Sequence, residues 1–213
     1  MALKNAKAFF PTYIYKTKLL RSKASAFNAE LLAECLQLRL DDSAGVKWSK
    51  QNYIGGYTSY ASMPLIHKMS STFERLEREI SKHVASFCKT LEFDLRDDQT
   101  GPGKLTMGDC WVNIMPAQVS HSFHIHPQSV ISGTYYVAVP KGAAGIRFED
   151  PRINNFMAAP LRKKNCRPEN QNHVTLIPQA SDLILFESWL RHEVPASSCD
   201  KERISISFNY NWV

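Results

Sequence analysis

The sequence predicts an α+β fold, mainly β, in which helices precede a β-sandwich of the jelly-roll type. One long amphipathic segment before residue 100 predicts a helix. After residue 100, short apolar runs alternate with turns that contain proline, glycine or asparagine. The chain has 213 residues, 44% of them hydrophobic, which is enough for one large β domain with attached helices. We therefore expect a single domain, 1–213, with a strand and helices in 1–100 and the jelly-roll core in 101–213.

The first hundred residues contain four expected elements. Residues 9–16 alternate weakly between apolar and polar and predict an opening strand. Residues 28–40 predict a helix, with Asn28 as its N-cap. Residues 48–62 are polar, aromatic and glycine-bearing, which predicts a loop. Residues 70–91 predict the longest helix, because apolar side chains recur there every three or four positions.

The second half contains short runs typical of β-strands, separated by turn residues. The expected strands cover residues 105–115, 120–126, 133–139, 146–148, 173–177, 182–186, 192–194 and 203–212. Many short strands with frequent turns favour the jelly-roll arrangement. Between them, residues 162–167 form a basic cluster that we interpret as a solvated loop.

Two histidines on one of these strands predict a metal site. His124 and His126 are two residues apart, so a strand places both rings on one face, with Cα atoms roughly 6.5–7 Å apart. His192 follows a distant apolar strand and can supply a third imidazole. Three ligands on one side of an ion leave the other side open, which is the arrangement of a catalytic metal site.

The other four histidines are expected not to bind the metal. His121 is an odd number of residues from His124, so a regular strand would turn it to the opposite face, at the rim. The remaining three lie in the helical half or on a later strand: His67, His83 and His173.

An arginine follows the third histidine. Arg203 opens a strand that can pair beside the strand carrying His192, and a guanidinium there can bind a carboxylate with two hydrogen bonds.

These residues resemble the 2-oxoglutarate and iron(II)-dependent oxygenases, and more narrowly an uncharacterised microbial family within that superfamily. The matching runs are short but ordered along nearly the whole chain: residues 9–12, 52–59, 111–113, 124–127, 132–136, 148–152, 185–186, 192 and 203–209.

The resemblance implies a double-stranded β-helix, cupin-like, with the N-terminal helices packed on one sheet. It implies Fe(II) held by His124, His126 and His192, with 2-oxoglutarate and dioxygen as co-substrates. It also implies that Arg203 pairs with the far carboxylate of 2-oxoglutarate. Further contacts to the co-substrate are implied for Ser205, Asn113 and Tyr136.

One position departs from the superfamily pattern, which has Asp or Glu where this chain has His126. A site with two histidines and a carboxylate carries one negative charge, whereas three neutral histidines carry none. A carboxylate ligand could instead come from Asp150 or Glu187. For Asp150 we favour a turn and an ion pair with Arg152.

The composition indicates the cellular compartment of the protein and the partners that it favours. The five cysteines form no Cys-x-x-Cys pair, which favours reduced thiols. The chain lacks a long apolar run, and its first residues lack the apolar core of a signal peptide, so we expect a cytoplasmic protein. A scattered net charge of +6 does not support a nucleic-acid partner.

Two other functional classes remain open at this point. One is a three-histidine, cupin-type dioxygenase that does not use 2-oxoglutarate, and the other is a non-catalytic jelly-roll binding protein. The oxidised substrate and the oligomeric state are not indicated by the sequence.

Overall fold

The computed structural model describes residues 7–213 except 21, 23, 98–100 and 153. The first six residues, part of the segment in which we found no signal-peptide pattern, lie outside that range, as does the expected division at residue 100.

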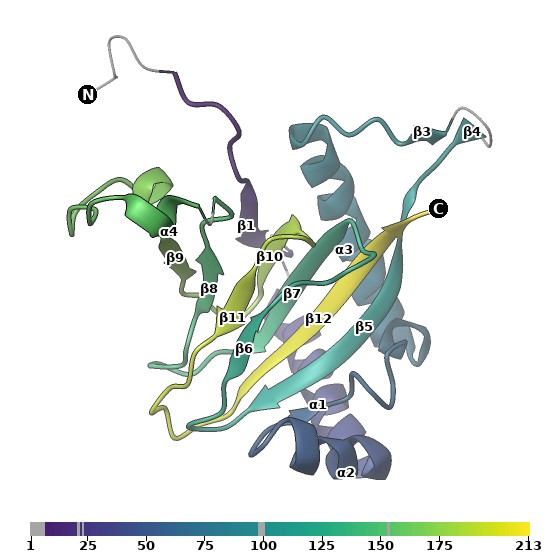
Figure 1. The fold of residues 1–213 in the computed structure, drawn as a ribbon. Coiled ribbons are helices and arrows are strands. Elements are labelled where there is room, and N and C mark those ends of the chain that lie inside the picture. Colours follow the sequence, from purple (N-terminus) through teal and green to yellow (C-terminus); the bar gives the residue numbers. More distant parts are fainter. Residues whose placement is uncertain (1–6, 21, 23, 98–100, 153) are drawn as a thin grey trace.

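Two facing antiparallel sheets form the fold (Figure 1). The larger sheet has the order β1-β10-β7-β12-β5-β2, and the smaller has the order β6-β11-β8-β9. The strands of the larger sheet are β1 (Ile14–Lys18), β2 (Tyr57–Thr58), β5 (Leu105–Met115), β7 (Ile131–Ala138), β10 (Asp182–Glu187) and β12 (Arg203–Trp212). Those of the smaller sheet are β6 (His121–His124), β8 (Ile146–Glu149), β9 (His173–Leu176) and β11 (His192–Val194). The expected mainly-β, double-stranded β-helix is confirmed.

Helices cover the outer face of the larger sheet (Figure 1). They are α1 (Ala24–Asp41), α2 (Ser43–Asn52) and α3 (Ser71–Thr90). The Ser70 side chain caps α3 by accepting a hydrogen bond from the Phe73 N–H at 3.2 Å. The apolar stripe of α3, which includes Leu76, Ile80 and Val84, is buried against the sheet. The expected helix over residues 70–91 is therefore confirmed.

Strand β12 shows how the sequence separates the two faces of the larger sheet. Ile204, Ile206 and Phe208 belong to the core beneath the helices. Arg203 and Ser205 alternate with them and line a pocket between the two sheets. The period of two therefore makes one face of the strand structural and leaves the other face free for a site.

The N-terminal elements differ from the sequence prediction. The first helix begins at Ala24 rather than Asn28, whose amide lies inside the helix and donates to the Val137 carbonyl at 2.6 Å. The expected loop over residues 48–62 is wrong at its start, because α2 continues to Asn52. The sequence of α2 shows no apolar helical pattern, because the residues that it buries, Gly45 and Ser49, are small. The opening strand begins at Ile14, later than expected.

The remaining described elements are short. They are β3 (Arg96–Asp97), β4 (Gly101–Pro102), α4 (Asn155–Ala158), and two 3-10 turns, η1 (Ile66–Lys68) and η2 (Pro168–Asn170). None of the helices among the described residues has the length and apolar character that a membrane crossing requires.

Candidate metal and co-substrate site

Paired strands of the smaller sheet bring two of the candidate ligands together. His124 on β6 lies directly opposite His192 on β11, and their ring centroids are 4.3 Å apart. His126 follows the end of β6, where its backbone N–H donates to the Ser188 carbonyl at 3.0 Å. One nitrogen from each of the three rings lies within 4.8 Å of the others. The pairing of β6 with β11 thus brings the three imidazoles together, although His126 lies just beyond the end of β6.

Backbone carbonyls orient two of the rings. His124 Nδ1 lies 2.7 Å from the Ser122 carbonyl oxygen, and His192 Nδ1 lies 2.8 Å from that of Leu190. A carbonyl can only accept, so each Nδ1 carries the proton. The lone pair is then on Nε2, which is free to bind a metal, and this is the usual arrangement around metal-binding histidines.

Burial keeps these rings neutral. Desolvation, assisted by the neighbouring imidazoles, lowers the pKa of His126 and of His192 from about 6.5 to about 3. Burial also lowers the pKa of His124, against the hydrogen bond to Ser122. Because a metal binds neutral imidazole, the cluster is ready for a cation across the neutral pH range.

His121 does not turn away from the site as expected. Its ring centroid lies 4.1 Å from that of His124, and it lines the same pocket. The reason is a bulge: His192 pairs with His124 but Val194 pairs with His121, so two steps along β11 match three along β6. The extra residue reverses the alternation of side chains. The expected place at the rim holds, because His121 is partly open to solvent.

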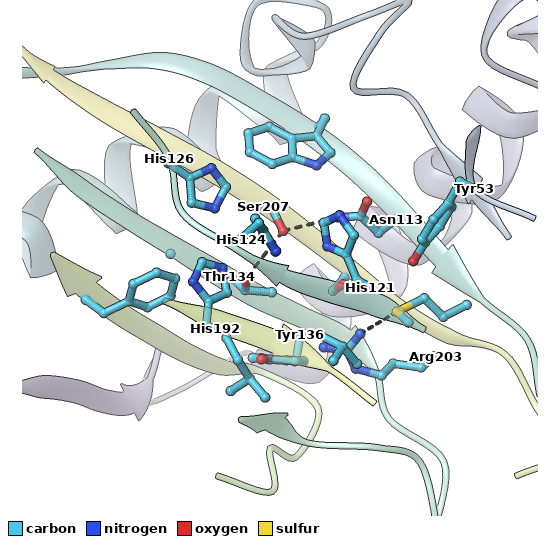
Figure 2. Close-up of a pocket in the computed structure, with 17 residues that line it drawn as sticks. Tyr53, Asn113, His121, His124, His126, Thr134, Tyr136, His192, Arg203 and Ser207 are labelled. Carbon is cyan, nitrogen blue, oxygen red and sulfur yellow. Dashed lines mark hydrogen bonds between the residues drawn. The ribbon is translucent and has the colours of Figure 1, made fainter. Parts of the chain in front are cut away.

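A buried arginine shares this pocket with the imidazoles (Figure 2). Arg203 is only 4% exposed, and its Nε has no hydrogen-bond partner. Its Nη1 lies 2.9 Å from the Met115 sulfur, and its guanidinium carbon lies 4.9 Å from the centre of the Tyr136 ring. Among the described residues, no carboxylate forms an ion pair with it.

The other expected co-substrate contacts also line the pocket: Asn113, Ser205 and Tyr136. Asn113 Nδ2 donates to Ser207 Oγ at 3.1 Å. The Tyr136 hydroxyl is buried beside Arg203: burial raises its pKa, and the neighbouring guanidinium partly opposes that rise. Tyr135, the next residue along β7, points to the opposite side, where its hydroxyl donates to Asn28 Oδ1 at 2.8 Å.

The Arg203 guanidinium provides a test of fit for 2-oxoglutarate. A buried guanidinium with an unpaired Nε and no carboxylate beside it is costly unless a ligand satisfies it. The guanidinium is a donor, and a carboxylate is an acceptor of the opposite charge. Together with three neutral imidazoles, the donor set fits iron(II) and a dicarboxylic keto acid.

Sequence patterns missed several pocket residues: Tyr53, Trp111, Thr134, Ser207 and His121. Tyr53 comes from the segment expected to be a loop, and its ring packs edge-on against His121 at 5.8 Å. The Trp111 ring lies 5.9 Å from that of His126. Thr134, Ser207 and Trp111 alternate with core residues on β7, β12 and β5, and that alternation was the available signal.

Unlike His121, Asp150 and His83 lie outside the site, as expected. Asp150 accepts from Arg152 Nε at 2.9 Å, as the turn-and-ion-pair interpretation predicts. His83 contacts the Tyr15 hydroxyl and the Leu19 carbonyl, on the helical side. Neither Asp150 nor Glu187 belongs to the histidine group or lines the pocket.

Solved structures share this fold. A prolyl-4-hydroxylase from Pseudomonas putida aligns over 94% of this chain and 92% of its own, with 14% identity and a TM-score of 0.60. The epimerase SnoN from nogalamycin biosynthesis, in complex with Fe³⁺ and α-ketoglutarate, aligns over 94% and 79%, with 18% identity and a TM-score of 0.63. HygX from Streptomyces hygroscopicus, with nickel and 2-oxoglutarate bound, aligns over 94% and 83%, with 10% identity and a TM-score of 0.62. No curated protein matches the chain by sequence.

Residues 109–209 match the model of a family described as "Putative 2OG-Fe(II) oxygenase". The chain is therefore similar to the 2-oxoglutarate and iron(II)-dependent oxygenases in sequence over this segment, and in fold over almost its whole length. The matched segment runs from β5 to β12, so it contains all three imidazoles and Arg203.

Proposed function

We propose that the protein is a dioxygenase that uses iron(II) and 2-oxoglutarate to hydroxylate a substrate still to be identified. The observation that carries this proposal is the buried guanidinium of Arg203, which has no carboxylate partner among the described residues, in the same pocket as three neutral imidazoles. Imidazoles alone indicate a metal, whereas a cation without a carboxylate partner indicates an acidic ligand beside that metal.

Each pocket residue then has a role. His124, His126 and His192 would hold the iron, the first and last through Nε2, because backbone carbonyls bind the opposite nitrogen. Arg203 would fix the far carboxylate of 2-oxoglutarate, assisted by Tyr136 from the neighbouring strand β7. Ser205 and Asn113 are paired across β12 and β5, which suits them to donate to the same ligand.

The protein contributes position and a dry environment. Iron(II) together with 2-oxoglutarate, when bound, supplies the oxidising chemistry that side chains lack. Phe186 packs against His192 with ring centroids 4.5 Å apart, and Trp111 lies beside His126. These rings restrict water near the imidazoles and hold them in place.

One alternative uses the same imidazoles. A three-histidine dioxygenase without 2-oxoglutarate would bind its substrate directly to the metal, and the ligand set alone fits both classes. Arg203 fits the first class directly, because its co-substrate carries a carboxylate, whereas the second class would need a substrate that is itself an acid.

An anaerobic titration tests the proposal. Iron(II) is added to the metal-free protein, followed by 2-oxoglutarate, and the visible charge-transfer band of the iron–keto-acid chelate is recorded. We expect the band to appear only with both additions and to saturate at one equivalent of each. A band that never forms, although iron binds, would exclude the 2-oxoglutarate-dependent class. Release of succinate on admitting oxygen then separates it from the alternative dioxygenase.

A cytoplasmic location is also part of the proposal. It is supported by the five cysteines, all of which are free, with Cys35, Cys88 and Cys110 buried.

A further inference from the structure

The pocket lacks negative charge. Among the described residues that line it, Arg203 has the one fixed charge, and none is Asp or Glu. The nearest acidic residue along the chain, Glu193, follows His192 directly but points to the other face of the smaller sheet, where it pairs with Arg147. Glu149 on β8 likewise pairs with Arg191. The smaller sheet therefore keeps its carboxylates on the outside.

The charge of the complete site follows from this lining. A divalent cation and Arg203 bring three positive charges, and 2-oxoglutarate brings two negative ones. Three neutral imidazoles leave one positive charge unbalanced, whereas a carboxylate in place of His126 would balance it. Protonation of His121 would only increase the excess. An uncompensated charge in a partly buried pocket is costly, so the complete site favours one more anion.

The lining also offers donors for such a group. The hydroxyls of Thr134 and Ser207 face each other across β7 and β12 at 3.3 Å, and neither is among the groups assigned to 2-oxoglutarate. Hydroxyl groups bind anions readily when no carboxylate competes for them. The pocket thus combines donors with excess positive charge.

We propose that the pocket takes a third acid group beside the two carboxylates of 2-oxoglutarate, and that the substrate supplies it as a carboxylate or a similar oxyanion. The assignment rests on the proposed function, since it counts iron(II) and 2-oxoglutarate as present. It narrows the substrate to acids and disfavours amines and other cations.

The test uses small anions as probes of the loaded protein. Under anaerobic conditions, protein with iron(II) and saturating 2-oxoglutarate is titrated with sodium acetate or with sodium chloride, at constant ionic strength. The position of the charge-transfer band measures binding of each anion. We expect saturable binding of acetate. Binding of chloride without acetate would overturn the substrate assignment, and binding of neither anion would overturn the proposal as a whole.

Matched variants isolate the charge. His126→Asp adds one negative charge, and we expect acetate affinity to fall at least tenfold, while His126→Asn has the shape of Asp without the charge. If these variants bind no iron, Ser207→Asp and Ser207→Asn make the same comparison away from the candidate ligands. Equal acetate affinity in an Asp variant and its Asn partner would contradict the proposal.

The titration separates a failure of the acidic-substrate proposal from a failure of the proposed function. The chelate band with iron(II) and 2-oxoglutarate alone tests the function, and it is recorded before any anion is added. A normal band with no response to acetate leaves the oxygenase assignment intact and removes only the acidic substrate.

Discussion

Arg203 is a residue that the fold alone does not require. Its guanidinium is buried, yet it contacts the sulfur of Met115 and the ring of Tyr136 rather than a carboxylate of the described residues. Burying a charge without a hydrogen-bonded counter-ion destabilises a protein. A ligand that pairs with the guanidinium best explains why this residue is present. Binding that ligand is then the function for which the protein tolerates the loss of stability.

Replacing this arginine should separate stability from function. In Arg203→Met, we expect 2-oxoglutarate affinity to fall about 10- to 100-fold, because charge-assisted hydrogen bonds to the co-substrate are lost. Iron affinity should change little, because the imidazoles are untouched. The unfolding free energy of the metal-free variant should be equal to or above that of the wild type. Isothermal titration and denaturant unfolding measure the two effects, and a less stable variant that still binds 2-oxoglutarate normally would refute the assignment.

At the scale of residues, the sequence predicted the three candidate metal ligands but not every residue that surrounds them. The spacing of His124, His126 and His192 pointed to one cluster, and the structure brings these rings together. His121 was misplaced because a bulge is not visible in a pattern of alternation. Tyr53 was missed because its position depends on tertiary contacts of an irregular segment.

At the scale of elements, Asp42 holds the segment that supplies Tyr53. It is buried and caps α2 by accepting from the Gly45 N–H at 2.8 Å. It also accepts from the hydroxyls of Tyr57, at 2.9 Å, and Ser62, at 2.6 Å. One carboxylate therefore ties α2 to β2 and to the turn beyond it.

Removing this carboxylate should destabilise the protein. We expect Asp42→Ala to lower the free energy of unfolding by about 2–4 kcal/mol, because a cap is lost and buried donors lose their acceptor. Asp41→Ala is the matched control: Asp41 is exposed and accepts only from Gln37 of its own helix, so it should cost less than about 0.5 kcal/mol. Urea unfolding measures both, and similar losses in the two variants would contradict this role for Asp42.

Elements with strong periodicity were predicted, and those held by tertiary contacts were not. Helix α3 and strand β12 have a continuous apolar pattern, and both lie close to their expected bounds. Helix α2 has no such pattern. Hydrogen bonds to the Asp42 carboxylate, rather than an apolar stripe, hold it in place. The beginning of α1 was placed late because Asn28, a typical capping residue, instead bonds to β7 from inside the helix.

For the whole molecule, the neutral imidazoles predict a dependence of stability on pH. Folding lowers the pKa of His126 and His192 to about 3, from about 6.5. Between these values the unfolded chain binds more protons than the folded one, so stability falls as the pH decreases from about 6.5 to about 3. Each group contributes a slope of at most about 1.4 kcal/mol per pH unit.

Urea unfolding of the metal-free protein at several pH values measures this slope. We expect His192→Gln to show a shallower slope than the wild type over the same range. A slope that is unchanged in the variant would show that the acid sensitivity arises elsewhere.

Ligands that bind between the two sheets should stabilise the whole fold. At 100 times its dissociation constant, a ligand adds about 2.7 kcal/mol to the unfolding free energy. We expect nickel(II) to raise the unfolding temperature, and 2-oxoglutarate to raise it further only when nickel is present. Arg203→Met should keep the first increase and lose the second. Differential scanning calorimetry measures both, and an equal second increase in the variant would contradict the role of Arg203.

The most direct measurement is an anaerobic crystal structure with iron(II) and 2-oxoglutarate, with anomalous differences recorded at the iron edge. Our account predicts one iron peak within bonding distance of nitrogens from His124, His126 and His192, and the far carboxylate of 2-oxoglutarate on the Arg203 guanidinium. An iron bound by a carboxylate of the chain in place of one of these imidazoles, or a co-substrate without contact to Arg203, would contradict it.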